Sequence, residues 1–262
     1  MDKSTLGGLL LAVTGIIGGL MIEGGNLTQI LQPTAAMIVF GGTIGAVMVQ
    51  FPLPVVIAGF RRLAHVFFEP ERNPSAVIEE MLRYAHKARR EGIVSLDNDI
   101  GAVSDPFLKK SLMLAVDGTE AQELRSMMEL EMDNLSEHEE KIPQVFESAG
   151  GFAPTIGIIG AVLGLIQVMQ HLDKIDEVGR GIAVAFVATI YGVGSANLFF
   201  LPAAGKLKIR IREEQVTRQM MLEGVVSILE GMNPRMLENK LLGFIASKEE
   251  STPEKPAESE PQ

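Results

Sequence analysis

The sequence predicts an all-α membrane protein with four transmembrane helices, a large helical cytoplasmic domain, and long helices that extend from the third and fourth spans. Three observations predict this class. Of the 262 residues, 47% are apolar. They gather in four runs without Asp, Glu, Lys or Arg, at 4–22, 24–60, 148–170 and 181–205. Each run is long enough for a helix that crosses a bilayer core of about 30 Å, and the Lys and Arg residues are unevenly distributed between its two sides.

The first two spans are expected near 4–23 and 33–53, within a transmembrane segment 1–59. The second run holds only one span, because residues 26–32 are polar and Pro52 marks its end. A secretory signal peptide is the alternative for the first run. We disfavour it, since the run is longer than a typical signal core, no A-x-A cleavage site follows, and a second span comes at once.

Residues 60–148 are expected to form a helical cytoplasmic domain. Asn73 and the proline after it supply an N-cap and a first helical residue for an amphipathic helix that ends at Gly92. Asp105, also followed by a proline, begins a second and shorter helix.

A third helix is expected to run from residue 119 to 171, through the third span near 149–171, with a kink at Pro143 as the alternative. At 1.5 Å per residue such a helix is about 80 Å long. His138 falls on its apolar stripe, where we expect a packed or water-bridged side chain rather than a metal ligand. The stripe has a seven-residue repeat and consists of Ala121, Leu124, Met128, Leu135, Ile142, Val145 and Ala149.

The fourth span is expected near 181–203, so that spans three and four occupy 149–203. The sequence KLKIRIR at 206–212 alternates polar and apolar residues, which alone suggests an edge strand. We prefer helix, because the segment continues a span and later apolar residues keep helical spacing, and we assign C-terminal cytoplasmic helices to 204–247. The tail 248–262 is rich in Pro and Glu, a composition typical of disordered segments.

Charge sets the expected orientation. If both termini are cytoplasmic, only Lys174 and Arg180 of the 23 Lys and Arg residues fall in the outer loops, 24–32 and 172–180. This bias follows the positive-inside rule and predicts a multi-pass protein surrounded by membrane lipid. The net charge of −10 lies in the soluble parts and argues against nucleic acid as a partner.

Catalytic chemistry has no recognisable basis in the sequence. There is no Cys, no hydrolase, kinase or dinucleotide motif appears, and the four His residues are scattered, so we expect no enzyme, no cofactor and no metal site. Spans three and four contain no Asp, Glu, Lys or Arg, although an ion relay normally needs a titrating group at membrane depth. The sequence therefore predicts that another chain supplies the titrating carboxylate.

Small residues suggest where that chain packs. Gly160 and Gly164 form a GxxxG pair that lets a second backbone approach closely, and Gly157 extends the pair; packing within the chain is the alternative. Pro154 lies in the same helix, where it removes a backbone donor and frees a carbonyl for water or an ion. The alternative for Pro154 is a simple start or kink of the span.

Three motifs resemble the MotA group of flagellar motor stator subunits, in the MotA/TolQ/ExbB proton-channel superfamily. FAPTIGIIGAVLGLI at 152–166 is similar to the third-span signature, and GIAVAFVATIYGVGSANLFFLP at 181–202 to the fourth. KARREGIVSLDNDI at 87–100 resembles the charged cytoplasmic segment typical of MotA. That segment separates the MotA branch from TolQ and ExbB proteins, which usually have three spans.

The resemblance implies a function and partners. Such proteins form a ring of five subunits in the bacterial cytoplasmic (inner) membrane, around a dimer of a single-span MotB-type partner that carries the ion-binding Asp. Ion flow turns the ring, and its cytoplasmic charges push the rotor switch protein. Two alternatives stay open: a TolQ/ExbB-like energiser of an envelope process, and a non-conducting membrane scaffold.

The resemblance also implies residue roles along the ion path. Thr189 matches the threonine that faces the partner's Asp, and Pro154 and Pro202 match functional prolines of the family. Thr155 is a further polar group of this path. Ala161 stands where sodium-driven members tend to carry Thr, which favours protons as the coupling ion.

A second set of roles falls on the charged cytoplasmic segment. Arg89 and Asp97 match the charged pair that meets the rotor, although the family commonly has the longer Glu at the second position. Arg90 and Asp99 lie in the same polar segment, and we expect all four side chains to be exposed and to steer the rotor electrostatically.

Overall fold

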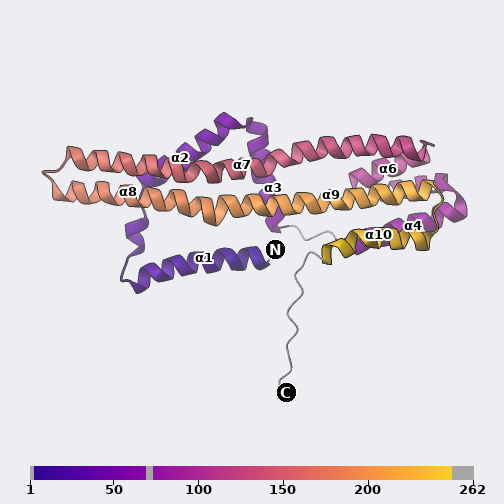
Figure 1. The fold of residues 1–262 in the computed structure, drawn as a ribbon, viewed down its shortest axis with the longest axis horizontal. Helices are drawn as coiled ribbons and strands as arrows, with labels where there is room; N and C mark the ends of the chain where they lie inside the picture. The colour runs from indigo at the N-terminus through magenta and orange to yellow at the C-terminus, as the bar shows by residue number, and fades with distance from the viewer. Residues whose placement is uncertain (1–2, 69–72, 250–262) are drawn as a thin grey trace, which may run out of the picture. The chain divides into compact units, whose positions relative to one another are not determined.

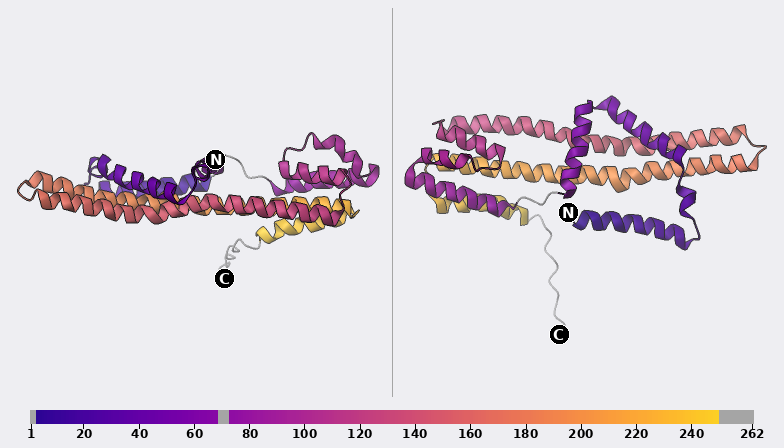
Figure 2. Two further views of the ribbon diagram at one scale, coloured as in Figure 1. Left: turned by 90° about the horizontal axis from the view of Figure 1, so that it is seen from above. Right: turned by 180° about the vertical axis from the view of Figure 1, so that it is seen from behind.

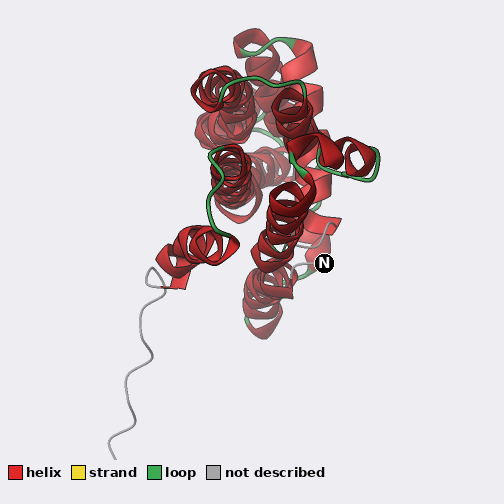
Figure 3. Cartoon of the chain, turned by 90° about the vertical axis from the view of Figure 1, so that its right-hand side faces the viewer, coloured by secondary structure: helices red, strands yellow, loops and turns green. Residues whose placement is uncertain are grey.

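The computed structural model describes residues 3–68 and 73–249, and every element in this part of the chain is helical (Figure 3). The helices form two compact units. The first unit contains residues 3–68 and 137–211, and the second unit contains residues 73–136 and 212–249. This helical content agrees with the predicted fold class.

Three helices open the first unit: α1 (Lys3–Ile22), α2 (Pro33–Gln50) and α3 (Leu53–Phe68). A 3-10 turn, η1 (Leu27–Ile30), lies between α1 and α2. Helix α2 ends before the predicted residue 53, because the missing N–H of Pro52 cannot continue its hydrogen bonds. The structure thus adds a separate helix, α3, that the sequence analysis did not distinguish.

Two long helices follow. Helix α7 (Ala121–Gln170) is continuous through Pro143 and Pro154, which confirms the prediction of one helix through the third span. Helix α8 (Ile175–Ser195) returns beside it after a short loop (Figures 1 and 2). Helix α9 (Leu201–Leu229) then includes the segment 206–212, so the preferred helix is confirmed there and the strand is excluded.

A π-helical turn, η3 (Ala196–Phe200), joins α8 to α9. Within it the N–H of Leu201 donates to the carbonyl of Ala196, five residues back. Pro202 explains this widening, because its ring has no N–H to donate and would crowd the carbonyl four residues before it in a regular α-helix. This irregularity was not predicted from the sequence.

The first unit packs through small apolar contacts. Ala35 and Val39 of α2 meet Val187 and Ala188 of α8 in one buried cluster. Further clusters join α2 and α3 to α7, and α3 to α7 and α9; their buried members are Val47, Val56, Leu63, Val145, Phe146, Ala149, Ala203, Ala204 and Leu207. Helix α1 differs, since none of its residues from Ser4 to Ile22 is buried.

The second unit begins with α4 (Pro74–Glu91), capped by the side chain of Asn73, which accepts a hydrogen bond from Ser75 N. Gly92, at φ +84°, ends α4. A 3-10 turn, η2 (Ile93–Leu96), and a single helical turn, α5 (Asp97–Ile100), follow. The unit also contains α6 (Pro106–Val116) and α10 (Pro234–Glu249).

The Asp105 side chain caps α6, because it accepts hydrogen bonds from Phe107 N and Leu108 N. Both predicted helix starts in this region, at Asn73 and Asp105, are therefore confirmed. A single core of large side chains joins these helices to the ends of α7 and α9. Its fully buried members include Met81, Leu96, Leu108, Leu112, Leu124, Met128, Met220, Met221, Leu222 and Leu237.

The predicted stripe of α7 is buried or half-buried at all seven positions. His138 lies on the exposed side of the helix, so the packed environment expected for it is wrong, while a water-bridged side chain stays a prediction. Lys248 and Glu249 of the predicted tail 248–262 belong to α10 instead, and the rest of that tail lies outside the described residues. Four helices of the described part are long and apolar enough to cross a membrane, and they start at Ser4, Pro33, Ala121 and Ile175.

Candidate functional site

Helices α7 and α8 approach each other through glycine. A Cβ added at Gly157 would lie 2.9 Å from the carbonyl oxygen of Ala188 and 3.2 Å from Cα of Gly192. A Cβ added at Gly192 would lie 2.5 Å from the carbonyl oxygen of Ala153. No larger residue fits at these positions unless one backbone moves away from the other.

The same contact continues along the pair. A Cβ at Gly164 would lie 2.7 Å from the carbonyl oxygen of Gly181, and one at Gly160 would lie 2.8 Å from Cβ of Ala188. The three glycines of α7 that were predicted to pack against a partner helix therefore contact α8 of the same chain. Packing within the chain was the alternative considered for them. Whether they also admit a partner helix stays a prediction.

Pro154 lies half-buried in this contact, with its Cα 3.2 Å from the position of a Cβ at Gly192. The carbonyl four residues before it belongs to Gly150, which loses its regular helical donor because Pro154 has no N–H. Gly150 packs against Leu201, whose side chain lies 2.6 Å from the position of an added Cβ. The structure thus brings two backbone irregularities together, the interruption at Pro154 and the π-helical turn before Leu201.

The threonines of the predicted ion path bond within their own helices. Thr189 is half-buried, and its hydroxyl donates to the carbonyl of Ala185 at 3.2 Å. Thr155 is exposed, and its hydroxyl donates to the carbonyl of Phe152 at 2.8 Å. Each oxygen keeps lone pairs that can accept another hydrogen bond. Because Gly157 contacts Ala188, Thr189 lies level with this first part of the span in α7.

Ala161 and Pro202 are the two remaining residues of the predicted ion path, and they lie on either side of the level of Thr189. Ala161 is half-buried in α7, one residue after Gly160, which contacts Ala188. Pro202 is exposed at the start of α9, next to the Leu201 that covers Gly150. Pro154 thus contacts the level of Gly192, whereas Pro202 follows the Leu201 that covers Gly150.

Tyr191 has a structural role that the sequence did not reveal. Its hydroxyl donates to the carbonyl of Ile30 at 2.5 Å and accepts from Gln32 N at 3.3 Å. Its ring stacks on Phe40 with the centroids 5.9 Å apart. Through these hydrogen bonds, the Tyr191 side chain connects the segment between α1 and α2 to α8. No local pattern signals these contacts, since the partners are more than 150 residues apart in the chain.

The charged cytoplasmic segment divides into paired and unpaired side chains. Arg89, Arg90 and Asp97 are exposed, and none forms an ion pair or side-chain hydrogen bond within the described residues. Asp99 is different, because it is half-buried and accepts from Lys87 Nζ at 2.7 Å. Arg89, Arg90 and Asp97 thus have the expected exposure, and Asp99 has it only in part, since its side chain is 37% exposed.

Comparisons with known proteins bear on both sites. Residues 100–220 match the model of the MotA/TolQ/ExbB proton channel family, and residues 6–92 match the model described as Motility protein A N-terminal. Motility protein A of Bacillus subtilis is 38% identical over 95% of this chain and 93% of its own length. The chain belongs to the MotA/TolQ/ExbB proton channel family. Motility protein A of Helicobacter pylori (strain ATCC 700392 / 26695) is 34% identical over 94% of this chain and 96% of its own length.

Solved structures of this family agree with the fold. A chain of the C. jejuni MotAB structure superposes with a TM-score of 0.89 at 32% identity, covering 99% of this chain and 100% of that one. A chain of the flagellar MotAB stator complex from Bacillus subtilis gives a TM-score of 0.85 at 36% identity, covering 97% and 100%. The arrangement of helices is therefore that of a MotA-type family member over nearly the whole chain.

Proposed function

We propose that this chain is the ring-forming stator subunit of a bacterial flagellar motor and that, with a single-span MotB-type partner, it converts ion flow into torque on the rotor. One observation carries the proposal. Helices α7 and α8 form a tightly packed pair whose apolar runs contain no Asp, Glu, Lys or Arg, while the similar structures are those of MotAB complexes. Such a pair needs a carboxylate from a second chain before it can relay protons.

In this proposal four helices span the bacterial inner membrane: α1, α2, the second half of α7, and α8. Both termini lie in the cytoplasm, as the positive-inside rule requires. The large exposed side chains of these helices contact lipid or neighbouring chains, and they include Leu10, Leu11, Ile22, Met37, Val49, Met169 and Phe186. Helix α1 buries no residue against its own chain, which supports its use as a contact surface in a ring of five subunits.

The ion path follows the level of Pro154 and Thr189. The Thr189 hydroxyl donates to its own helix, so an oxygen lone pair is available to a protonated carboxylic acid of the partner. The Gly150 carbonyl, freed by Pro154, offers a further acceptor. Ala161 adds no oxygen, and a partly dehydrated sodium ion needs oxygen ligands. The lack of a side-chain oxygen at Ala161 therefore favours protons as the coupling ion.

Torque arises at the unpaired charges of the second unit. Arg89, Arg90 and Asp97 carry charge on the surface without a partner in the described residues. Rotor charges of opposite sign would be attracted to them as the ring turns. The Lys87–Asp99 ion pair holds the segment that presents them, so we assign Asp99 to positioning rather than to direct contact.

Ion flux from purified chains tests the proposal. The chain alone and the chain with its single-span partner are reconstituted into vesicles, and internal pH is followed under a membrane potential. We expect flux only from the complex. Proton flux from the chain alone at the rate of the complex would contradict the proposal, and so would a conducting complex that never supports swimming, which would favour an envelope energiser.

A further inference from the structure

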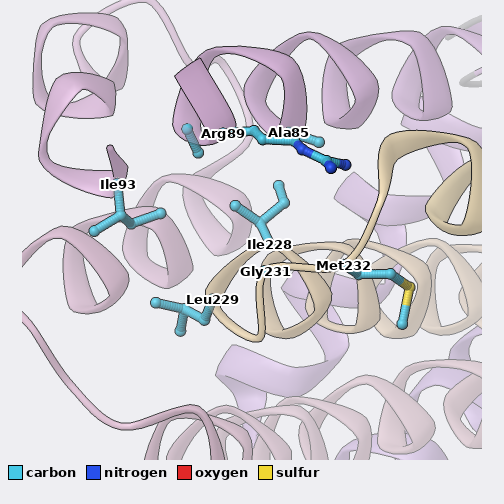
Figure 4. Close-up of a pocket in the computed structure, with 8 residues that line it drawn as sticks. Ala85, Arg89, Ile93, Ile228, Leu229, Gly231 and Met232 are labelled. Atoms are coloured by element: carbon cyan, nitrogen blue, oxygen red, sulfur yellow. The ribbon is translucent and has the colours of Figure 1, made fainter. Parts of the chain in front are cut away.

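The turn that joins α7 to α8 and a pocket in the second unit are two features that the proposed function leaves without a role. The pocket has a volume of about 230 Å³ and lies between α4, η2 and α9 (Figure 4). Nothing in the described part of the chain shows what occupies it. The turn is different, because contacts within the chain cross it. They bring His171, directly after α7, together with the beginning of α8.

The imidazole of His171 replaces a lost backbone donor at the end of α7. The N–H of His171 donates to the Val168 carbonyl, three residues back, at 3.2 Å. The Gln167 carbonyl therefore lacks the N–H that a regular α-helix would supply from position 171. Nδ1 of His171 lies 3.1 Å from this carbonyl oxygen, and basic side chains near a helix C-terminus can satisfy such carbonyls. A proton on Nδ1 completes the last turn of α7.

The other ring nitrogen of His171 faces a carboxylate in the first turn of α8. Nε2 lies 3.3 Å from one oxygen of Glu177. Lys174 Nζ lies 3.1 Å from the other oxygen of the same carboxylate. The side chains of His171 and Glu177 are 39% and 37% exposed, so water has access to both and can deliver or remove a proton.

The other charged residues of the turn are Asp173, Asp176 and Arg180, and all three are exposed. Within the described residues, the contacts of the imidazole are those with Gln167 and Glu177. In Figures 1 and 2 the turn lies at the end of the α7–α8 pair, away from α2 and α3 of the same unit. The protonation state of His171 therefore acts through these two contacts.

Both partners of the imidazole only accept hydrogen bonds. A carbonyl oxygen and an ionised carboxylate have lone pairs but no hydrogen to donate. A neutral imidazole has one N–H, so it satisfies one partner and directs the lone pair of its second nitrogen at the other. A doubly protonated imidazolium donates to both, and its charge is favourable beside Glu177 and at the C-terminal end of α7. The arrangement at the turn therefore requires the protonated form.

We propose that His171 is a proton-binding site that holds the α7–α8 turn closed. With the proton bound, the imidazolium links the Gln167 carbonyl to the Glu177 carboxylate, and without it one of these links is lost. The closed turn is thus favoured at acidic pH. This preference disappears as the pH rises through the range of about 5 to 8 in which histidine side chains titrate. Only the position of the turn outside the membrane rests on the proposed function.

The turn adjoins the last close contact of the helix pair. A Cβ at Gly181 would lie 2.6 Å from the Val168 side chain, and a Cβ at Gly164 would lie 2.7 Å from the Gly181 carbonyl oxygen. Val168 also accepts the N–H of His171. An open turn therefore loosens the residues that end this contact. In the proposed orientation, the pH outside the cell acts on this end of the pair.

Hydrogen exchange of the complete complex tests the proton site. Peptides that cover residues 166–178 are followed by mass spectrometry at about pH 5 and about pH 8, the limits of histidine titration. After correction for the intrinsic pH dependence of exchange, we expect the turn to exchange about threefold to fivefold more slowly at the lower pH, the scale of an exposed ion pair. His171→Gln should abolish this difference, because its amide does not titrate. His138→Gln is the matched control, since it removes an exposed histidine from α7 itself, and it should retain the difference.

Two further variants separate proton binding from a simple loss of contact. The amide of Glu177→Gln accepts from a protonated Nε2 and donates to a bare one, so the turn closes in both states and the pH difference should disappear. Lys174→Met should retain the difference, because lysine stays charged over this pH range. A difference that survives in His171→Gln, or one that His138→Gln removes, would overturn the proton site. Ion flux does not enter this measurement, so a complex with pH-dependent exchange but no flux would contradict the proposed function alone.

Discussion

The two units of the molecule are packed by opposite means. In the first unit, α7 and α8 meet through glycine and alanine. The backbone of one helix occupies the space that a larger side chain of the other helix would need. In the second unit, the centre consists of large side chains such as Met81, Leu108 and Phe107, and ion pairs connect the helices around it.

The difference follows from the solvent expected around each unit. In lipid, burying an apolar side chain gains little, because the lipid tails are equally apolar, and close contact between backbones provides the attraction instead. In water, about 25 cal/mol is gained for each Å² of apolar surface that is buried. A substitution should therefore be most damaging in the first unit when it adds atoms, and in the second unit when it removes them.

Gly164→Leu should have the largest effect. Its Cβ alone would lie 2.7 Å from the carbonyl oxygen of Gly181 and 2.9 Å from Ala185 N, so α8 must move away from α7. We expect loss of the folded α7–α8 pair, measured as the yield of monodisperse complex. Gly151→Leu is the control on the same helix, since a Cβ at Gly151 has nothing within 4 Å. Equal yields from the two variants would contradict the close contact.

Leu108→Ala should have the next largest effect. Leu108 is fully buried in the second unit, and removing a buried Leu side chain costs about 2–5 kcal/mol. Leu130→Ala is the control, because Leu130 of α7 is 63% exposed and should change stability by less than about 0.5 kcal/mol. Urea unfolding, followed by the susceptibility of the second unit to proteolysis, measures both. A similar loss in the two variants would show that the core is assigned wrongly.

Glu223→Gln should have an intermediate effect that depends on pH. Arg125 donates to both oxygens of the Glu223 carboxylate, Lys240 lies 2.7 Å from one of them, and these contacts lower the pKa of Glu223 to about 2. The carboxylate therefore stabilises the fold fully above its ordinary pKa of about 4.5, and this contribution disappears as the pH falls towards 2.

Unfolding of the second unit measures this effect. At pH 7 we expect Glu223→Gln to be less stable by on the order of 2 kcal/mol, and the difference should shrink steadily below pH 4. Glu129→Gln provides the comparison in the same unit, because Glu129 is 55% exposed and lies 3.7 Å from the same Arg125, so its loss should be barely measurable. A pH-independent difference for Glu223→Gln would contradict the ion-pair explanation.

Much of the fold could be predicted from the sequence because local signals and long apolar runs agreed. The caps at Asn73 and Asp105, the end at Gly92, and the continuous helix through Pro143 all depend on neighbouring residues. His138 was misplaced because a seven-residue repeat fixes the side of a helix only approximately over many turns. Only packing of the whole helix determines which side is exposed.

The candidate site was harder to predict, since its details depend on contacts between distant segments. Small residues in a span show that some backbone approaches closely, but not whether it belongs to the same chain. The pairing of Asp99 with Lys87 and the anchoring of a loop by Tyr191 likewise require the folded chain. The π-helical turn before Pro202 was missed because a proline in a helix can produce either a kink or a widened turn.

Thr189→Val should have the smallest effect on stability and a large effect on function. Valine keeps the shape of threonine, and the lost hydrogen bond goes to the Ala185 carbonyl, an acceptor that also takes a regular helical N–H. Such bonds from a helical Thr to the carbonyl four residues back contribute little to stability. The expected yield of complex is therefore unchanged.

Thr217→Val is the matched control, because the Thr217 hydroxyl donates to the Glu213 carbonyl with the same spacing, at 2.9 Å, in the second unit. If the Thr189 hydroxyl serves only its own helix, the two variants should behave alike in yield, proton flux and swimming speed. If it also accepts a proton-bearing partner group, Thr189→Val alone should lose flux and swimming together. The two variants differ in whether the lost hydroxyl lies along the proposed ion path. Proton flux, compared at equal yield of complex, therefore shows whether the Thr189 hydroxyl takes part in transport or only bonds within its own helix.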